Sequence, residues 1–462
     1  MSRQTREACV VRRHDGWPDL LSLARSNPDR YPCLLENSGT SSQLGRYDIL
    51  FAFPGDTLAS RPDGSTTYNG QPVGKDNFIQ YINKIRSKVN VRDGCRDFDL
   101  PFTGGWFLYL GYELAAEIEP VLAASLMTPE MPRAVMMRIP AGIVCDKQTH
   151  ECYLFANGAD AELMLESIQA DCLETSDFVH QAGDFGICKL IEEDEARFIT
   201  GIDRIKQYIS AGDVFQVNLS RTWQTGEPCS LSPYDAYARL RETNPAPFSC
   251  VARLSNDIHV LSSSPERLVE VRQGVVRTRP IAGTYPRGED HAEDRRLSAE
   301  LLMHPKERAE HIMLVDLERN DLGRICRPGS VHVPELMVVE SYEHVHHIVS
   351  EVSGELCQGV LPGDIISAVF PGGTITGCPK IHCMEIIAEL EQNPRDAYTG
   401  SVGYLGNNGD MDLNILIRTI TSRNGQYSLR AGAGIVADSD PTREIAETRS
   451  KAEGMCRVFA DA

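Results

Sequence analysis

The chain has 462 residues, of which 42% are hydrophobic and 24% are charged, a composition typical of a soluble globular protein with one large core or two domains. Its net charge of −19 excludes a basic surface for nucleic acid, and it would repel an anionic substrate unless a bound cation and a few arginines or lysines invert the field locally. No apolar run is as long as a membrane span, and the N-terminal MSRQTREACVVRRHDG lacks the apolar core of a signal peptide, so we expect a cytoplasmic protein without membrane contact.

Fourteen cysteines are spread singly along the chain, without a C-x-x-C pair. This spacing indicates neither a zinc site nor a disulfide framework. We therefore expect buried free thiols in a reducing compartment.

The N-terminal part of the chain alternates short apolar runs with turn residues, which is typical of strands. These strands are predicted within residues 31–56, 101–115 and 134–156. Residues 157–192 change character, with one weak helix followed by irregular sequence. We therefore predict an N-terminal region at 1–185 and a second domain at 190–460.

The second half of the chain combines helices with hairpins. Residues 193–211 have the pattern of an amphipathic helix that ends at Gly212. Asn-Gly pairs beginning at positions 408 and 424 predict two hairpins. Many strands joined by hairpins, with the helices in separate runs, predict an α+β fold with antiparallel sheets.

The stretch from Ala431 to Lys451 joins a glycine-rich run, which permits close approach of the backbone to something small, to a helix with Asp440 as its N-cap. Glu444, Glu447 and Lys451 are spaced at i, i+3 and i+7, so they project from one face of this helix. Two carboxylates and an ammonium beside such a loop indicate a metal ion and an anionic ligand together. The alternative is a solvated face with one Glu–Lys pair.

Two charged residues elsewhere are candidates for ligand contacts. Arg418 lies on a strand predicted at Asp412–Ile420, where it can clamp a carboxylate or pair with Asp412 along the strand. Glu310 leans toward the apolar face of a helix predicted at 305–323, so it needs a partner, of which a metal ion is one.

Two further residues are candidates for acid or base chemistry. His347 lies before an apolar strand segment and can point into a cleft, although a core or surface histidine is the commoner case. Glu266 follows a strand in the sequence SSSPER, where it is a general acid or base, or simply a partner of Arg267. The glycine-rich PGGTITGCPK at 371–380 suits an anion or a turning backbone.

Taken in order, these segments resemble the chorismate-utilising enzymes: component I of anthranilate synthase, component I of aminodeoxychorismate synthase, and the isochorismate and salicylate synthases. The resemblance covers residues 195–458 and rests on AGDVFQVNLSR, SPER, RPIAGTYPRG, EHIMLVDLERNDLGR, HIVS, FPGGTITGCPKIHCMEII, GSVGYL, DLNILIRT and AGAGIVADSDPTREIAETRSK. It implies the fold of that family, which is α+β with large antiparallel sheets packed in a sandwich and helices outside.

The resemblance also implies a metal site. Glu310 and Glu447 look like Mg²⁺ ligands, and Glu444 looks like a residue that supports the metal through a water or a neighbouring contact. The metal ion would bind the ring carboxylate of chorismate and supply the cation that the negative net charge requires.

Roles in binding and catalysis are implied for the other matching residues. Contacts to the enolpyruvyl carboxylate and the neighbouring ring substituents are implied for Arg418, Lys451 and the backbone of Gly434. Glu266 and His347 look like the acid and base groups that flank the ring. Thr284 and Gly283 look like residues that line it.

Two positions distinguish the members of the family. The water-adding members have a lysine that activates water where this chain has Gln216, so isochorismate synthase is disfavoured. Many aminodeoxychorismate synthases have a nucleophilic lysine where this chain has Ala282, the residue typical of anthranilate synthase. The segments GRYDIL, PFTGGWFLYLGYELA and NPAPFS resemble aminodeoxychorismate synthase, and we give three dispersed segments more weight than one substitution.

The predicted function is therefore Mg²⁺-dependent amination of chorismate to 4-amino-4-deoxychorismate, for 4-aminobenzoate and folate biosynthesis. Nothing in the sequence resembles a glutaminase domain, so ammonia is expected from a separate glutamine amidotransferase subunit. The alternatives are component I of anthranilate synthase and, in a different class, a non-catalytic chorismate- or tryptophan-binding protein.

A second ligand is also implied by the resemblance. The segment LLENSG and two later residues resemble the tryptophan pocket of these enzymes, with the pocket formed by Leu35, Ser38, Arg46, Pro247 and Phe248. The alternative is ordinary strand and loop packing, because Asn37 departs from the usual Leu-Leu-Glu-Ser.

Overall fold

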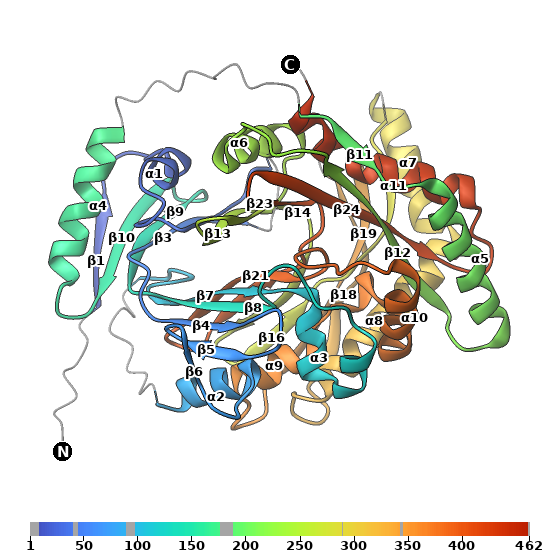
Figure 1. Cartoon of the computed structure of the whole chain (residues 1–462), viewed down its shortest axis with the longest axis horizontal. Coiled ribbons are helices and arrows are strands. Elements are labelled where there is room, and N and C mark those ends of the chain that lie inside the picture. The colour runs from blue at the N-terminus through green and yellow to red at the C-terminus, as the bar shows by residue number, and fades with distance from the viewer. Residues whose placement is uncertain are drawn as a thin grey trace.

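The computed structural model describes residues 9–39, 45–88, 98–175, 188–288, 290–341 and 345–460. Two large antiparallel sheets face each other, and helices cover their outer faces (Figure 1). This arrangement confirms the predicted α+β fold of sandwiched antiparallel sheets with outer helices. In the ranges described, no helix combines the length and the apolar character needed to cross a membrane.

The first sheet contains strands from both ends of the chain. In spatial order they are β1 (Cys9–His14), β10 (Glu151–Asn157), β9 (Ala141–Asp146), β3 (Tyr47–Ala52), β2 (Cys33–Glu36), β13 (Phe248–Ser255), β14 (Ile258–Ser264), β23 (Thr419–Arg423), β24 (Gln426–Ile435), β12 (Gln216–Thr225) and β11 (Leu190–Glu192), with β20 (Gly377–Cys378) paired to β12.

The second sheet is also built from distant parts of the chain. In spatial order its strands are β17 (Ile281–Pro286), β19 (Val345–Glu355), β16 (Val275–Thr278), β15 (Arg267–Arg272), β22 (Met411–Asn414), β21 (Ser401–Gly406), β7 (Gly105–Leu110), β8 (Ala134–Ile139), β4 (Thr57–Ser60), β5 (Thr66–Tyr68) and β6 (Gln71–Pro72), with β18 (His332–Ser341) paired to β19.

Helices pack on both sheets. Those against the first sheet are α1 (Leu20–Ser26), α4 (Ala161–Thr175), α5 (Glu195–Ala211), α6 (Pro233–Thr243), α10 (Lys380–Glu391) and α11 (Pro441–Cys456). The others are α2 (Phe78–Lys88), α3 (Ala115–Ile118), α7 (His291–Met303), α8 (Pro305–Gly323) and α9 (Pro362–Val369). Short 3-10 turns occur at η1 (Tyr112–Leu114), η2 (Pro120–Ala124), η3 (Gly373–Ile375) and η4 (Arg457–Phe459).

Strand β3 shows why the sheets need apolar residues on both faces. Phe51 packs in the space between the sheets, with its ring centroid 6.1 Å from that of Phe107 in β7. Leu50 and Ala52 belong instead to the core under the outer helices. Because successive side chains of a strand point to opposite faces, a strand buried on both sides requires a continuous apolar run.

Both sheets contain strands from both parts of the predicted domain division. β2 pairs with β13 in the first sheet, and β7 pairs with β21 in the second. The two regions therefore share both sheets. The predicted end of the N-terminal region at residue 185 lies outside the described residues, which stop at 175 and resume at 188.

Several elements predicted from local sequence are confirmed. Helix α5 begins after Asp194, whose side chain accepts a hydrogen bond from the backbone N–H of Ala196, and it ends at Gly212 with φ of 84°. The strands β21 and β22, and likewise β23 and β24, pair as antiparallel hairpins around the two Asn-Gly turns.

The continuous strand predicted at Asp412–Ile420 is wrong. β22 ends in the second sheet and β23 begins in the first, so the chain crosses between the sheets at residues 415–418. Ile415 and Leu416 are both buried, but in different hydrophobic cores. The apolar run therefore continues through the crossing, so the end of one strand and the start of the next cannot be recognised from the sequence.

The structure also corrects the prediction that the cysteines are all free thiols. Cys188 and Cys229 form a disulfide, with their Cα atoms 5.9 Å apart. The two residues are separated by 41 positions in the sequence, and the pairing of β11 with β12 brings their segments side by side. Other cysteines, such as Cys33 and Cys250, are buried free thiols as expected.

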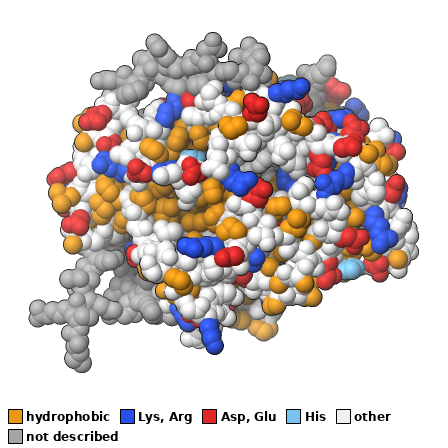
Figure 2. All heavy atoms as spheres, in the orientation of Figure 1, with side chains coloured by type: hydrophobic (Ala, Val, Ile, Leu, Met, Phe, Trp, Pro, Cys, Tyr) orange, Lys and Arg blue, Asp and Glu red, His pale blue; other side chains and the backbone are white. Residues whose placement is uncertain are grey.

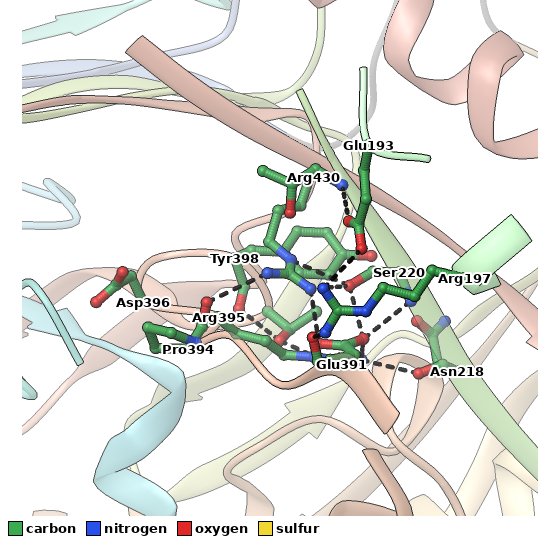
Figure 3. A network of polar contacts seen from close by, with 12 residues as sticks. Glu193, Arg197, Asn218, Ser220, Glu391, Pro394, Arg395, Asp396, Tyr398 and Arg430 are labelled. Atoms are coloured by element: carbon green, nitrogen blue, oxygen red, sulfur yellow. Dashed lines mark hydrogen bonds and ion pairs between the residues drawn. The ribbon is translucent and has the colours of Figure 1, made fainter. Parts of the chain in front are cut away.

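A buried ion-pair network joins α10 to two strands of the first sheet (Figure 3). The carboxylate of Glu391 accepts hydrogen bonds from Arg395 (2.6 Å), from Arg430 of β24 (2.8 Å) and from the hydroxyl of Ser220 in β12 (2.7 Å). Burial opposes ionisation of Glu391, but the charges of Arg395 and Arg430 outweigh it and lower its pKa. One carboxylate therefore holds a helix and two neighbouring strands together.

We expect Glu391→Gln to destabilise the protein by about 3–5 kcal/mol, because the substitution leaves two buried guanidinium groups without a counter-charge. Denaturant unfolding followed by circular dichroism measures this loss. The matched control is Glu453→Gln in α11, which removes an exposed ion pair with Arg457 and is expected to cost at most about 1 kcal/mol. Equal losses in the two variants would contradict the importance given to the network.

Candidate active site

Four of the predicted site residues come together where β14 ends and the neighbouring strand β23 begins. The charge of Lys451 in α11 acts to lower the pKa of both Glu266 and His347, and the charge of Arg418 acts to lower the pKa of His347. Glu266 follows β14 and Arg418 precedes β23 in the first sheet, whereas His347 belongs to β19 of the second. The site therefore lies between the two sheets.

Helix α11 brings its cation to the glycine-rich end of β24. The side chain of Asp440 caps this helix, as predicted, by accepting a hydrogen bond from the N–H of Arg443 (3.0 Å). The Lys451 ammonium donates a hydrogen bond to the carbonyl oxygen of Gly432 (3.0 Å) and pairs with Glu447 (2.7 Å). Glu447 and Lys451 are both about half exposed, so this pair contributes little to stability and is open to ligand.

The space over the glycine run is filled by polar side chains of the protein itself. A Cβ atom added at Gly434 would lie 2.2 Å from the amide nitrogen of Gln216. One added at Gly432 would lie 2.7 Å from both the amide oxygen of Asn218 and the hydroxyl of Tyr398. The sequence predicts a close approach to the backbone here, and the structure shows that Gln216, Asn218 and Tyr398 make that approach.

Glu266 is the best proton donor among the residues of the site. It is buried, and burial raises its pKa to about 7, although the nearby Thr374 hydroxyl, the backbone of Ile281 and the charge of Lys451 act in the opposite direction. One of its carboxylate oxygens is buried without a hydrogen-bond partner among the described residues. Near neutral pH this group is therefore partly protonated and can donate a proton to a ligand.

His347 is buried beside two cations and stays neutral. Burial and the charge of Arg418 lower its pKa to about 3, although a hydrogen bond to the backbone of Gly283 acts in the opposite direction. A neutral imidazole can donate or accept a hydrogen bond but is not a proton donor at neutral pH. Of the two predicted acid and base groups, only Glu266 has a pKa suited to proton transfer near pH 7.

Arg418 is the cation best placed to bind an anion. It is half-buried, and burial lowers its pKa. Within the described ranges its guanidinium has no ion-pair partner, since Asp412 pairs with Arg267 instead through two hydrogen bonds of 2.9 Å. This excludes the alternative of an Arg418–Asp412 pair. Because a cation removed from water without a counter-charge is costly, the geometry favours an anionic ligand at this position.

The segment of β17 that resembles the ring-lining motif lies beside His347. Thr284 is opposite His347 and Ala282 is opposite Ile348 in the antiparallel pair with β19. Gly283 forms an irregularity between them with φ of 71°. The positive φ of Gly283 favours glycine at this position, and a Cβ there would lie 2.9 Å from the carboxylate at the end of the Glu307 side chain in α8.

The three predicted metal ligands lie on two helices. Glu310 is half-buried in α8, Glu444 is buried in α11, and Glu447 is exposed one turn further along α11. In the part of the chain that the structure describes, no three side chains of His, Cys, Asp or Glu are grouped closely enough to hold a metal ion. The donor set suits Mg²⁺ in its chemistry, because this cation prefers carboxylate oxygens, and the metal site stays a prediction.

Sequence reasoning missed a buried acidic group near Glu266. Burial raises the pKa of Glu318 in α8 to about 8, with Asp321 and Glu266 acting in the same direction and Lys380 opposing them. Lys380 of α10 pairs with Asp321 at 2.6 Å, so the end of α8 is joined to α10 by an ion pair. The signal for Glu318 was its position one turn after Leu314, on the buried face of the helix.

A second cavity, of about 240 Å³, lies between the sheets. Its lining includes four of the five residues predicted for the tryptophan pocket, namely Leu35, Arg46, Pro247 and Phe248. The fifth, Ser38, forms a hydrogen bond of 2.7 Å with Ser249, which also lines the cavity. On the face drawn in Figure 2, apolar side chains gather in a hollow between the two sheets.

Comparison with known proteins agrees with this geometry. Residues 31–457 match the family described as chorismate binding enzyme. The chain is 40% identical to aminodeoxychorismate synthase component 1 of Bacillus subtilis, over 91% of this chain and 90% of that protein. It is also 40% identical to anthranilate synthase component 1 of Streptomyces coelicolor, over 93% of this chain and 83% of that protein.

A solved structure supports the same assignment. Anthranilate synthase component I from Streptococcus pneumoniae has a TM-score of 0.79 to this chain at 32% identity, over 90% of this chain and 94% of that one. The chain belongs to the chorismate-binding enzyme family.

Proposed function

We propose that this protein aminates chorismate to 4-amino-4-deoxychorismate, using ammonia from a separate glutamine amidotransferase subunit. Membership of the family supports chorismate as the substrate. The observation that carries the proposal is the meeting of one buried acid, Glu266, with two cations, Lys451 and Arg418, between the sheets. Chorismate has two carboxylates, which need positive charges, and a ring hydroxyl, which needs a proton in order to leave as water.

The cations account for substrate binding. The guanidinium of Arg418 can hold a carboxylate of chorismate through two parallel hydrogen bonds, and the Lys451 ammonium adds a second positive charge nearby. A Mg²⁺ ion bound by Glu310, Glu447 and Glu444 would neutralise the ring carboxylate. These charges counter the repulsion between an acidic protein and an anionic substrate.

Glu266 accounts for departure of the hydroxyl. In its protonated form it donates a proton to the ring hydroxyl, which leaves as water while ammonia forms the new C–N bond. The resulting ammonium group then returns one proton to the Glu266 carboxylate, so that chorismate and ammonia give the amino product and water. His347, which stays neutral, contributes a hydrogen bond and not a proton.

Two residues bear on the choice of nucleophile and of ring carbon. Gln216 stands where water-adding relatives have lysine, and an amide cannot deprotonate water, which supports ammonia. Ala282, which lies opposite Ile348 of β19, favours a second candidate, component I of anthranilate synthase, because alanine is the residue typical of that enzyme at this position. The segments GRYDIL and NPAPFS, which favour aminodeoxychorismate synthase, contribute Arg46, Pro247 and Phe248 to the second cavity.

We also propose tryptophan as the occupant of that second cavity. Support comes from the residues that line it, which combine apolar side chains such as Leu35 and Phe248 with the charged Arg46 and Glu36. An amino acid with a large aromatic side chain needs both an apolar wall and charged groups for its ends.

Identification of the product tests the proposed function. Purified protein is incubated with chorismate, ammonium chloride and Mg²⁺, with and without an added aminodeoxychorismate lyase. We expect 4-aminobenzoate that depends on the lyase. Anthranilate formed without the lyase would instead establish the second candidate. No turnover at all would support the alternative of a non-catalytic binding protein.

The same assay tests the metal site. Chelation of Mg²⁺ with EDTA, and separately Glu447→Gln, are expected to abolish turnover while the circular dichroism spectrum stays unchanged, since Glu447 is half exposed and its ion pair is weak. Glu453→Gln, on an exposed part of the same helix, is the matched control. Normal activity of Glu447→Gln would show that Glu447 is not a metal ligand needed for turnover.

The pKa of Glu266 predicts a pH dependence. A general acid acts only in its protonated form, so kcat/KM for chorismate should fall about tenfold per pH unit above about pH 7 as Glu266 ionises. Initial rates in buffers of constant ionic strength measure the profile. Glu266→Gln should be inactive throughout, and a wild-type profile without a break near neutral pH would contradict this role.

A further inference from the structure

The buried acid Glu318 of α8 has no counter-charge of its own. Its side chain is buried, and the neighbouring ammonium of Lys380 pairs with Asp321 at 2.6 Å, while no ion pair of Glu318 occurs among the described residues. Burial and the charges of Asp321 and Glu266 raise its pKa to about 8, against the opposing effects of Lys380 and the Thr278 hydroxyl. Near neutral pH Glu318 therefore keeps its proton and is a hydrogen-bond donor.

The glycine-rich loop at residues 371–380 brings its first turn, η3, against this acid. η3 packs on α8. A Cβ added at Gly373 would meet the side chain of Leu317 in α8 and would lie 3.6 Å from Oε1 of Glu318. The loop backbone can approach α8 closely because Gly373 has no side chain. The carboxyl of Glu318 therefore lies beside the residue that directly precedes Thr374.

Thr374 also adjoins the acid of the candidate active site. Burial dominates the pKa of Glu266, and the Thr374 hydroxyl lies close enough to the Glu266 carboxyl to act against this effect. Oγ1 of Thr374 and Oε1 of Glu266 are both shielded from solvent, and neither has a hydrogen-bond partner among the described residues. A hydroxyl can accept one hydrogen bond and donate another, so Thr374 can connect Glu318 to Glu266.

The direction of these hydrogen bonds matters for proton donation. A carboxyl group carries its proton on one of two oxygens, and only the oxygen that faces the ligand can deliver it. When Oγ1 of Thr374 accepts a hydrogen bond from Glu318, its own hydrogen is free to point to Glu266. A hydroxyl that donates to one oxygen of Glu266 leaves the proton of that carboxyl on the other oxygen.

We propose that Glu318 positions the proton of Glu266 through the hydroxyl of Thr374. This inference rests on the proposed function, in which Glu266 donates a proton to the leaving hydroxyl. The carboxyl O–H of Glu318 donates to Oγ1 of Thr374, and the Thr374 O–H donates to the Glu266 oxygen that faces away from the ring. Both residues keep their own hydrogens, so the only proton transferred to the substrate is that of Glu266.

The first test compares Thr374→Val with Thr374→Ser in the ammonia-dependent assay. Valine has nearly the shape of threonine but no hydroxyl, so kcat should fall about tenfold as the proton of Glu266 loses its orientation. The KM for chorismate should change less than about twofold, because the binding cations are untouched. Serine keeps the hydroxyl and should keep kcat within about twofold of wild type.

The second test compares Glu318→Leu with Glu318→Gln. Leucine cannot donate a hydrogen bond, so kcat should fall about tenfold, whereas the glutamine N–H can replace the carboxyl O–H and should keep most of the activity. Glu117→Leu is the matched control, because Glu117 of α3 accepts hydrogen bonds from Phe78 N–H (2.9 Å) and from the hydroxyl of Ser60 in β4. β4 lies toward the other end of the second sheet from β17 and β19, so kcat should stay unchanged.

The double variant Thr374→Val with Glu318→Leu distinguishes positioning from general damage to the protein. If Glu318 acts through Thr374, the double variant should lose no more kcat than Thr374→Val alone. Circular dichroism and thermal unfolding check that each variant is folded. If Glu318→Leu does not fold, the comparison of Thr374→Val with Thr374→Ser carries the test.

A loss of about a hundredfold in the double variant would overturn the inference, because the two residues would then act independently. Wild-type kcat in folded Thr374→Val or Glu318→Leu would also overturn it, as would a loss in Glu318→Gln equal to that in Glu318→Leu. Failure of the proposed function gives a different result, in which the wild-type protein itself shows no ammonia-dependent turnover.

Discussion

The carboxylate of Glu391 holds together the strands that carry the site. It pairs with Arg430 in β24 and binds Ser220 in β12. Gly432 lies two residues after Arg430, and Asn218 lies two residues before Ser220. A buried ionic network therefore joins the two strands immediately beside the glycine run, where Asn218 pairs with Gly434 and its side chain approaches Gly432.

Ion pairs within the protein also determine which arginine side chains are available to bind an anionic substrate. Arg395 and Arg430 are occupied by Glu391, and Arg267 is occupied by Asp412. Arg418 is left without an ion-pair partner among the described residues, where the chain crosses between the sheets. In an acidic protein, local attraction for an anion arises from such selective pairing and not from the net charge.

Local sequence signals were sufficient for much of the fold and for part of the site. The Asp440 cap, the α5 helix and the Asn-Gly hairpins depend on neighbouring residues, so they could be predicted. The crossing at 415–418 could not, because apolar residues continue through it into two different cores. The contacts of Gln216 and Asn218 with glycines of β24 depend on strand pairing, which no local pattern reveals.

Binding of chorismate to Arg418→Met tests the central claim most directly. Isothermal titration calorimetry compares this variant with wild type and with Arg423→Met, which removes an exposed arginine of β23 that pairs with Glu130. We expect affinity to fall at least about tenfold for Arg418→Met and to stay unchanged for Arg423→Met. Unchanged affinity in a folded Arg418→Met variant would mean that chorismate does not bind between the sheets at this arginine.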